Sequence, residues 1–183
     1  VGAQVVGGWR IGGIMSIRTS TPTTAKITVR RTGYLFAAVR PNVVPGESNN
    51  PIHGPSIGCT NPDGSTFIEA GRKIEGPELF YDPCVFTIPP AGTVGNLGRN
   101  TLFGPSIVNL DISLQKDFPL GGDRRLQFRT EIFNVANHTN FRTPTANSMQ
   151  VFTGTGRYNT GVGQYVNTST TSRQIQFALR LSF

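Results

Sequence analysis

The last segment of the chain shows the clearest alternation of apolar and polar positions. Between residues 174 and 183 every odd position is apolar, and the even positions are mostly polar. The apolar positions are Ile175, Phe177, Leu179, Leu181 and Phe183. A period of two residues is typical of a β-strand whose two faces meet different surroundings. The pattern therefore predicts a strand over about residues 174–183.

Three further segments share this alternation, at about residues 9–18, 107–115 and 126–133. Gly13 and Ile14 depart from it within the first of these segments. Residues 116–125 carry a Pro and a Gly pair, which are typical of turns, so we expect the second and third strands to form a hairpin. A shorter strand is expected at residues 25–30.

The lengths of the connections follow the order long, short, long. Residues 19–106 and 134–172 join the strands on either side of the hairpin. Outer-membrane barrels have short periplasmic turns and long extracellular loops. In such a barrel the hairpin turn and the C-terminus would be periplasmic, and both long connections would be outside. A secreted, soluble β-sandwich, whose apolar rows pack as a core, remains the alternative.

Aromatic residues lie near the expected strand ends. Trp9, Phe118 and Phe183 fall near the inner ends, and Phe133 and Phe141 fall near an outer end. We expect them to form the aromatic girdles of a membrane barrel. Ordinary core aromatics at the ends of soluble strands are the alternative.

Composition agrees with an all-β, antiparallel class. The 183 residues include 22 Gly and 13 Pro, which would interrupt almost any long helix, and only 15% of the residues are charged. No apolar run approaches the ~18 residues of a transmembrane helix. Because the first residue is Val and no signal peptide is visible, we expect a piece of a larger protein.

The net charge of +7 does not point to nucleic acid, because the arginines form no basic stripe with interleaved aromatic residues. Charged side chains instead fall on the polar positions of the expected strands. These are Asp111, Arg129, Glu131 and Arg180. We expect them to face the lumen of a barrel and to pair across neighbouring strands.

The chain has two cysteines, Cys59 and Cys84, both in the first long connection. An even number of cysteines in an oxidising compartment favours a disulfide over free thiols. A zinc site is not expected, because two sulfurs and one nearby histidine, His53, fall short of four ligands at tight spacing. Scattered apolar residues in this connection indicate that it folds on itself rather than acting as a linker.

Catalytic signatures are missing from the sequence. The two histidines, His53 and His138, lie in loops without Ser, Asp or Cys at the spacing of a catalytic site. We therefore expect no enzymatic activity and no cofactor.

Several local motifs together carry a resemblance to a known family. They are Gly95-Asn96-Leu97-Gly98-Arg99-Asn100-Thr101-Leu102, Asn109-Leu110-Asp111, Leu126-Gln127-Phe128-Arg129, Glu131-Ile132-Phe133-Asn134, Asn137-His138-Thr139-Asn140-Phe141 and Arg173 to Phe183. The chain resembles the C-terminal barrel region of TonB-dependent outer-membrane receptors, in the class that begins with a carboxypeptidase-regulatory-like domain.

The resemblance implies a 22-stranded barrel in the bacterial outer membrane, plugged from the periplasm, that imports a solute with energy from the TonB complex. Residues 1–183 would be the C-terminal portion of this barrel domain, since too few strands are present to close it and no plug is visible. The parent protein would then contact outer-membrane lipid, an unidentified solute, and TonB through its N-terminal region.

The resemblance also suggests a role for the last strand. Ile175, Phe177, Leu179, Leu181 and Phe183 look like the C-terminal signal that the barrel-assembly machinery recognises, partly by strand addition. The simpler alternative is a closing strand whose apolar residues only face lipid.

Overall fold

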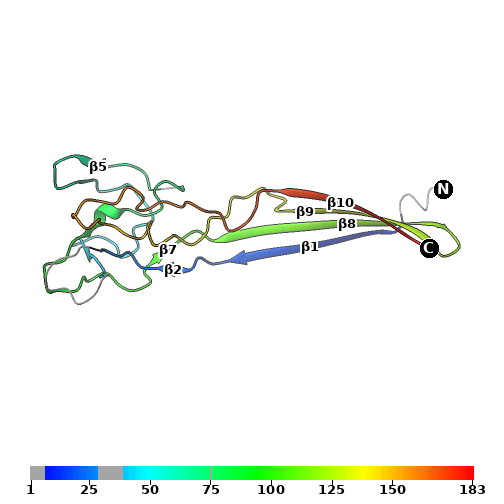
Figure 1. The fold of residues 1–183 in the computed structure, drawn as a ribbon, viewed down its shortest axis with the longest axis horizontal. Helices are drawn as coiled ribbons and strands as arrows, with labels where there is room; N and C mark the ends of the chain where they lie inside the picture. Colours follow the sequence, from blue (N-terminus) through cyan, green and yellow to red (C-terminus); the bar gives the residue numbers. More distant parts are fainter. Residues whose placement is uncertain (1–6, 29–38, 75) are drawn as a thin grey trace. The chain divides into compact units, whose positions relative to one another are not determined.

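A computed structural model of the chain describes residues 7–28, 39–74 and 76–183 (Figure 1). These residues divide into two compact units. The sheet unit comprises the described parts of Val1–Thr19, Ser106–Asn140 and Thr168–Phe183. The loop unit comprises those of Ser20–Pro105 and Phe141–Asn167, and so contains most of the two long connections.

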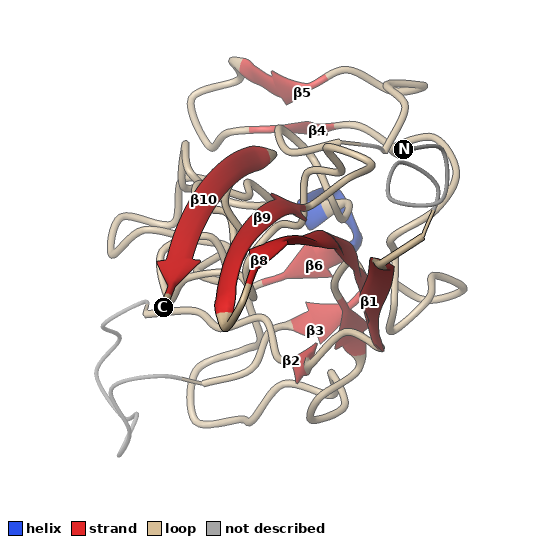
Figure 2. Ribbon diagram, turned by 90° about the vertical axis from the view of Figure 1, so that its right-hand side faces the viewer, coloured by secondary structure: helices blue, strands red, loops and turns tan. Residues whose placement is uncertain are grey.

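The sheet unit contains four long antiparallel strands in the order β1-β8-β9-β10. Their bounds are β1 (Trp9–Arg18), β8 (Ile107–Gly121), β9 (Arg124–Phe133) and β10 (Gln174–Ser182). Figure 2 shows the four strands following one another along a curved arc, as expected for part of a barrel wall. β1 and β10 are the edge strands of this sheet.

The hairpin between β8 and β9 is tighter than the sequence predicted. The expected turn at residues 116–125 is wrong, because pairing continues through Phe118 and Leu126 and leaves only Gly122 and Asp123 between the strands. Gly122 has a φ of 61°, a conformation that glycine adopts without strain. The register shifts between Pro119 and Gly121, so the proline is accommodated at an irregularity of the ladder.

The register gives the sheet two different faces, because directly opposed residues project to the same side. We call one the apolar face. It carries Trp9, Ile11, Gly13, Met15, Ile17, Val108, Leu110, Ile112, Leu114, Lys116, Phe118, Leu126, Phe128, Thr130, Ile132, Ile175, Phe177, Leu179 and Leu181. The alternate residues form the polar face, which includes Asp111, Arg129, Glu131 and Arg180. β1 pairs with β8 without a break, so Gly13 and Ile14 change the pattern of side chains and not the strand.

The loop unit is built from short strand pairs around a buried core. β2 (Pro22–Thr23) pairs with β7 (Leu102–Phe103), β3 (Asn42–Val43) with β6 (Phe86–Thr87), and β4 (Cys59–Thr60) with β5 (Thr66–Ile68). One turn of 3₁₀ helix, η1 (Pro83–Val85), precedes β6. No helix among the residues that the structure describes is long and apolar enough to cross a membrane.

The core of the loop unit confirms that the first long connection folds on itself. Tyr81 and Phe86 are fully buried, together with apolar residues from both long connections. The expected strand at residues 25–30 is not formed as such. Lys26 and Ile27 make single bridges to Gln150 and Val39, and residues 29–30 lie outside the described part of the chain.

Candidate functional site

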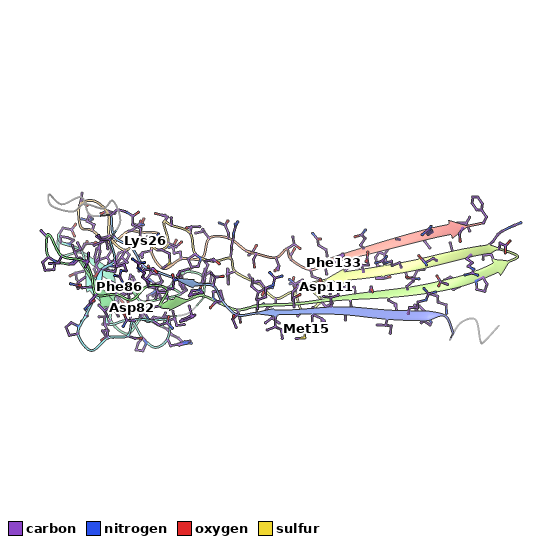
Figure 3. The ribbon with its side chains drawn as sticks, turned by 90° about the horizontal axis from the view of Figure 1, so that it is seen from below. Met15, Lys26, Asp82, Phe86, Asp111 and Phe133 are labelled. Atoms are coloured by element: carbon purple, nitrogen blue, oxygen red, sulfur yellow. A yellow bond between two sulfur atoms is a disulfide. The ribbon has the colours of Figure 1, made fainter. Side chains whose placement is uncertain are left out.

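The apolar face of the sheet unit is exposed rather than packed. Phe177 is 68% exposed and Leu179 is 71% exposed, and the apolar side chains of β1 are similarly uncovered. In Figure 3 side chains project from both sides of the strands, with Met15 labelled on β1. A contiguous exposed apolar surface of this extent marks a site that contacts another apolar phase.

One charged residue, Lys116, interrupts this apolar face close to the hairpin turn. Its Nζ lies 4.6 Å from the ring centroid of Trp9 and 5.3 Å from that of Phe118. The ammonium group also donates a hydrogen bond of 3.0 Å to the carbonyl of Gly7. Two aromatic rings and a carbonyl thus surround the charge, an arrangement suited to the boundary between an apolar phase and water.

The polar face brings some of the expected charged residues together and separates others. Arg129 forms an ion pair with Glu131 two positions along the same strand. Arg180 lies opposite Gln127 and makes no ion pair among the described residues. Asp111 does not pair with these charges, which corrects that expectation. Its Oδ1 accepts hydrogen bonds from the Asn109 amide and the Asn134 backbone N–H instead.

The outer aromatic girdle expected from sequence is also wrong. Phe133 lies opposite Gln174 and therefore belongs to the polar face. Phe141 belongs to the loop unit, where its ring stacks on Tyr165 at a centroid distance of 5.3 Å. The sequence could have placed Phe133 on the polar face, because it falls on the same alternate positions of the strand as Arg129 and Glu131.

The two cysteines form a disulfide, with their Cα atoms 5.3 Å apart, as predicted. The buried carboxylate of Asp82 supports this region. It accepts hydrogen bonds of 2.9 Å from the Ser56 hydroxyl, 2.9 Å from the Ile57 N–H and 3.0 Å from the Cys84 N–H. A buried charge is tolerated when several donors satisfy it, so Asp82 ties the two disulfide-linked segments together. Only its place before Pro83, at the start of η1, signals this role in the sequence.

A pocket of about 580 Å³ opens in the loop unit. It is lined by Phe67, Ile68, Arg72, Pro77, Glu78, Leu79, Thr160, Val162, Gln164 and Tyr165. Arg72 and Glu78 approach each other to 3.7 Å, and both side chains remain largely exposed. The pocket therefore combines an apolar lining with one charge of each sign, which suits a small ligand. The sequence carries no local sign of this pocket, because its walls come from both long connections.

Tyrosines in the loop unit have raised pKa values. Burial holds the pKa of Tyr165 well above its usual range. Burial, together with the negative charge of Asp82, raises the pKa of Tyr158 to about 12. Both hydroxyls therefore remain protonated at neutral pH and act as hydrogen-bond donors or acceptors.

One exposed carboxyl of the loop unit, that of Asp63, has a lowered pKa. Hydrogen bonds from the Ser65 hydroxyl and from Arg157 hold the pKa of Asp63 well below its usual value. Asp63 and Arg157 also form an ion pair, which joins the two long connections within this unit.

Among the residues that the structure describes, no three or more His, Cys, Asp or Glu side chains come together in a group that could hold a metal ion. His53 is exposed in its loop. The Nδ1 of His138 lies 3.0 Å from the Oδ1 of Asn140, within the turn after β9.

The chain matches the family model of the outer membrane beta barrel domain over residues 1–176. No curated protein and no solved structure matches the chain. The family agrees with the antiparallel sheet and its exposed apolar face, and it favours a membrane barrel over the soluble sandwich. The protein is therefore located at the bacterial outer membrane, and the chain belongs to the outer membrane beta barrel domain family.

Proposed function

We propose that the chain is the C-terminal barrel segment of a TonB-dependent outer-membrane receptor, whose complete 22-stranded barrel imports a solute. The two-faced sheet is the observation that carries this proposal. Its exposed apolar face suits lipid, and its polar face, with Arg129, Glu131 and Arg180, suits a wet lumen. The motifs from Gly95 to Leu102 and from Arg173 to Phe183 add the resemblance to TonB-dependent receptors.

The connections support one orientation of this barrel segment. A two-residue turn joins β8 to β9, whereas residues 19–106 and 134–173 make the connections at the opposite strand ends. Short periplasmic turns and long outer loops are the rule in such barrels. The hairpin turn and the C-terminus are then periplasmic, and the loop unit is extracellular.

The solute is captured by residues of the loop unit in this proposal, and TonB acts through a plug in the N-terminal part of the parent protein. The 580 Å³ pocket with Arg72 and Glu78 is the first place to search for capture residues. No catalytic activity is proposed, since transport needs binding and conformational change only.

Labelling of β10 tests the membrane arrangement. In the whole protein, with Cys59 and Cys84 replaced by Ser, single cysteines are placed along residues 175–183. Lipid-soluble thiol reagents should label odd positions, and water-soluble reagents should label even positions. Protection of the odd positions from both reagents indicates a packed core and rejects the barrel wall.

Binding of the purified periplasmic domain of TonB to the whole protein tests the receptor class separately. Saturable binding is expected. A barrel that shows the labelling pattern but binds no TonB domain is an outer-membrane protein of another class.

The last strand has a second role in this proposal, as the signal read by the barrel-assembly machinery. Deletion of Phe183 should lower the fraction of protein that assembles in the outer membrane. The residue is 93% exposed, so the deletion removes little packing within the chain. A control deletion within Gly154–Gly156, in an exposed loop, should leave assembly unchanged. Normal assembly without Phe183 would reject the signal and leave only a lipid-facing strand.

A further inference from the structure

A second pocket, of about 290 Å³, lies on the polar face of the sheet unit. It is formed where β8 passes the end of β9 and the start of β10. Its lining includes Asn109 and Asp111 of β8, Phe133 and Asn134 at the end of β9, and Thr170 and Thr171 before β10. Figure 3 labels Asp111 and Phe133 at this end of the strands.

The pocket contains a buried acceptor without a donor. The Oδ1 of Asn109 is buried and has no hydrogen-bond partner, while its Nδ2 donates to the Oδ1 of Asp111 at 2.9 Å. Buried side-chain oxygens without a partner are rare in proteins, and each one calls for a specific reason. Because this oxygen has no exposed surface, a ligand hydroxyl can donate to it only after the Asn109 side chain turns toward the pocket.

Asp111 offers a second acceptor beside the first. Its Oδ1 already accepts from the Asn109 amide and, at 2.8 Å, from the N–H of Asn134. Its Oδ2 accepts no hydrogen bond from any residue that the structure describes. Arg129 pairs with Glu131, and no cation among these residues pairs with Asp111. The pocket therefore favours hydrogen-bond donors and disfavours anions.

Phe133 supplies an apolar wall to a pocket that is otherwise polar. Gln174 lies directly opposite it on β10 and completes the lining with an amide that both donates and accepts. An apolar ring face beside convergent acceptors matches a molecule with C–H groups on its faces and hydroxyls on its edges. The small volume fits a single ring better than an extended chain.

We propose that this pocket binds one neutral sugar ring of the imported solute, with the ring lying against Phe133, one hydroxyl donating to Asp111 Oδ2 and a second donating to Asn109 Oδ1 once that side chain turns toward the ligand. The inference rests on the proposed function, because a solute reaches this pocket if the polar face lines the lumen of the receptor. It adds the substrate class, a hydroxyl-rich and uncharged carbohydrate.

The test is a binding measurement on the whole protein in detergent, by saturation-transfer NMR. The probes are methyl glycosides of neutral hexoses and pentoses, the corresponding hexuronates, and tetramethylammonium. Neutral glycosides should bind, and hexuronates should bind more weakly because Asp111 repels their carboxylate. Absence of glycoside binding, or binding of tetramethylammonium alone, overturns the proposal.

Two variants connect the binding to the pocket. Asp111→Asn keeps an oxygen for Asn109 and Asn134 but replaces the free acceptor with a donor, and should weaken glycoside binding about tenfold. Phe133→Leu should weaken it severalfold through loss of the ring face. Ser113→Ala, on the same face but outside the pocket, is the matched control. Equal affinity in Asp111→Asn and Ser113→Ala contradicts the site.

The outcomes separate the two proposals. Loss of glycoside binding with intact binding of the TonB domain rejects the sugar site and leaves the receptor class standing. Glycoside binding that depends on Asp111, in a protein that does not bind the TonB domain, supports the sugar site and rejects the receptor class.

Discussion

The two units of this chain use their apolar residues in opposite ways. In the loop unit Tyr81 and Phe86 are completely buried, whereas Phe177 and Leu179 of the sheet unit are largely exposed. The loop unit therefore gains stability from a core that excludes water. The sheet unit is held by backbone ladders and leaves its apolar side chains uncovered by the chain, as suits a surface that meets lipid. The buried apolar residues therefore mark the core of the loop unit, whereas the apolar residues of the sheet unit mark a surface.

The largest expected effect is the destabilisation of the loop unit by a substitution in its buried core, with the sheet unit unchanged. Phe86→Ala should cost the loop unit about 3–5 kcal/mol, because a large side chain leaves a cavity among buried neighbours. Hydrogen exchange of the protein in lipid should show faster exchange in loop-unit peptides and unchanged protection in β8 and β9.

Phe103→Ala is the control for this prediction, since Phe103 belongs to the same unit but is 46% exposed. A loss of protection in both units, or an equal effect of Phe103→Ala, would contradict the separation.

Removal of the disulfide should have the next largest effect. Replacing Cys59 and Cys84 with Ser releases a link across 25 positions and should destabilise the loop unit by about 3 kcal/mol. Limited proteolysis should then cleave between the two positions. Reduction of the unmodified protein should produce the same cleavage, and resistance in both cases would show that Asp82 and the core hold the segments without the bridge.

A charge on the apolar face tests the sheet unit directly. Leu179→Arg should cost about 2–4 kcal/mol if the residue lies near the middle of the bilayer, and less toward either interface. The fraction of heat-modifiable, assembled protein in outer membranes should fall. Gln176→Arg places the same charge on the polar face, opposite Glu131, and should assemble normally, and equal defects in both variants would reject the two-faced wall.

The smallest effect concerns pH. Because the pKa of Tyr158 is raised to about 12, the neutral phenol is favoured in the folded loop unit. Its contribution is fully present below pH 10, the usual tyrosine pKa. It is lost as the pH rises from 10 toward 12. The near-ultraviolet circular dichroism of the whole protein, which reports the packing of aromatic residues, should show an alkaline transition in this range. Tyr158→Phe should shift that transition to higher pH. An unchanged transition would place the sensitivity at another buried tyrosine.

The strands of the sheet unit can be predicted from the sequence, because each one shows the alternation of apolar and polar residues by itself. The limits of β1 and β10 agree closely with the predicted ranges, since both strands begin and end with the pattern. The end of β8 cannot be located from the sequence, because Pro119 and the following glycines indicate a longer turn. In the structure the ladder tolerates the proline at a register shift, so pairing with β9 overrides the local signal.

The candidate sites can be predicted only in part from the sequence. Two cysteines in one connection made the disulfide predictable, and parity placed Asp111 on the polar face. The partners of Asp111 were not predictable, because Asn134 reaches it only after the chain turns out of β9. Asp82 shows little signal in the sequence because two of its three donors, Ser56 and Ile57, lie about 25 positions earlier.

The sequence by itself determined the period-two strands, the two-faced sheet and the cysteine pair, because alternation and composition are local properties of the chain. Only the tertiary structure decided which residues share a pocket. The 580 Å³ pocket joins residues 67–79 to residues 160–165, and the smaller pocket joins three separate segments. Such contacts depend on how irregular connections close over long sequence distances, and no local pattern encodes that closure.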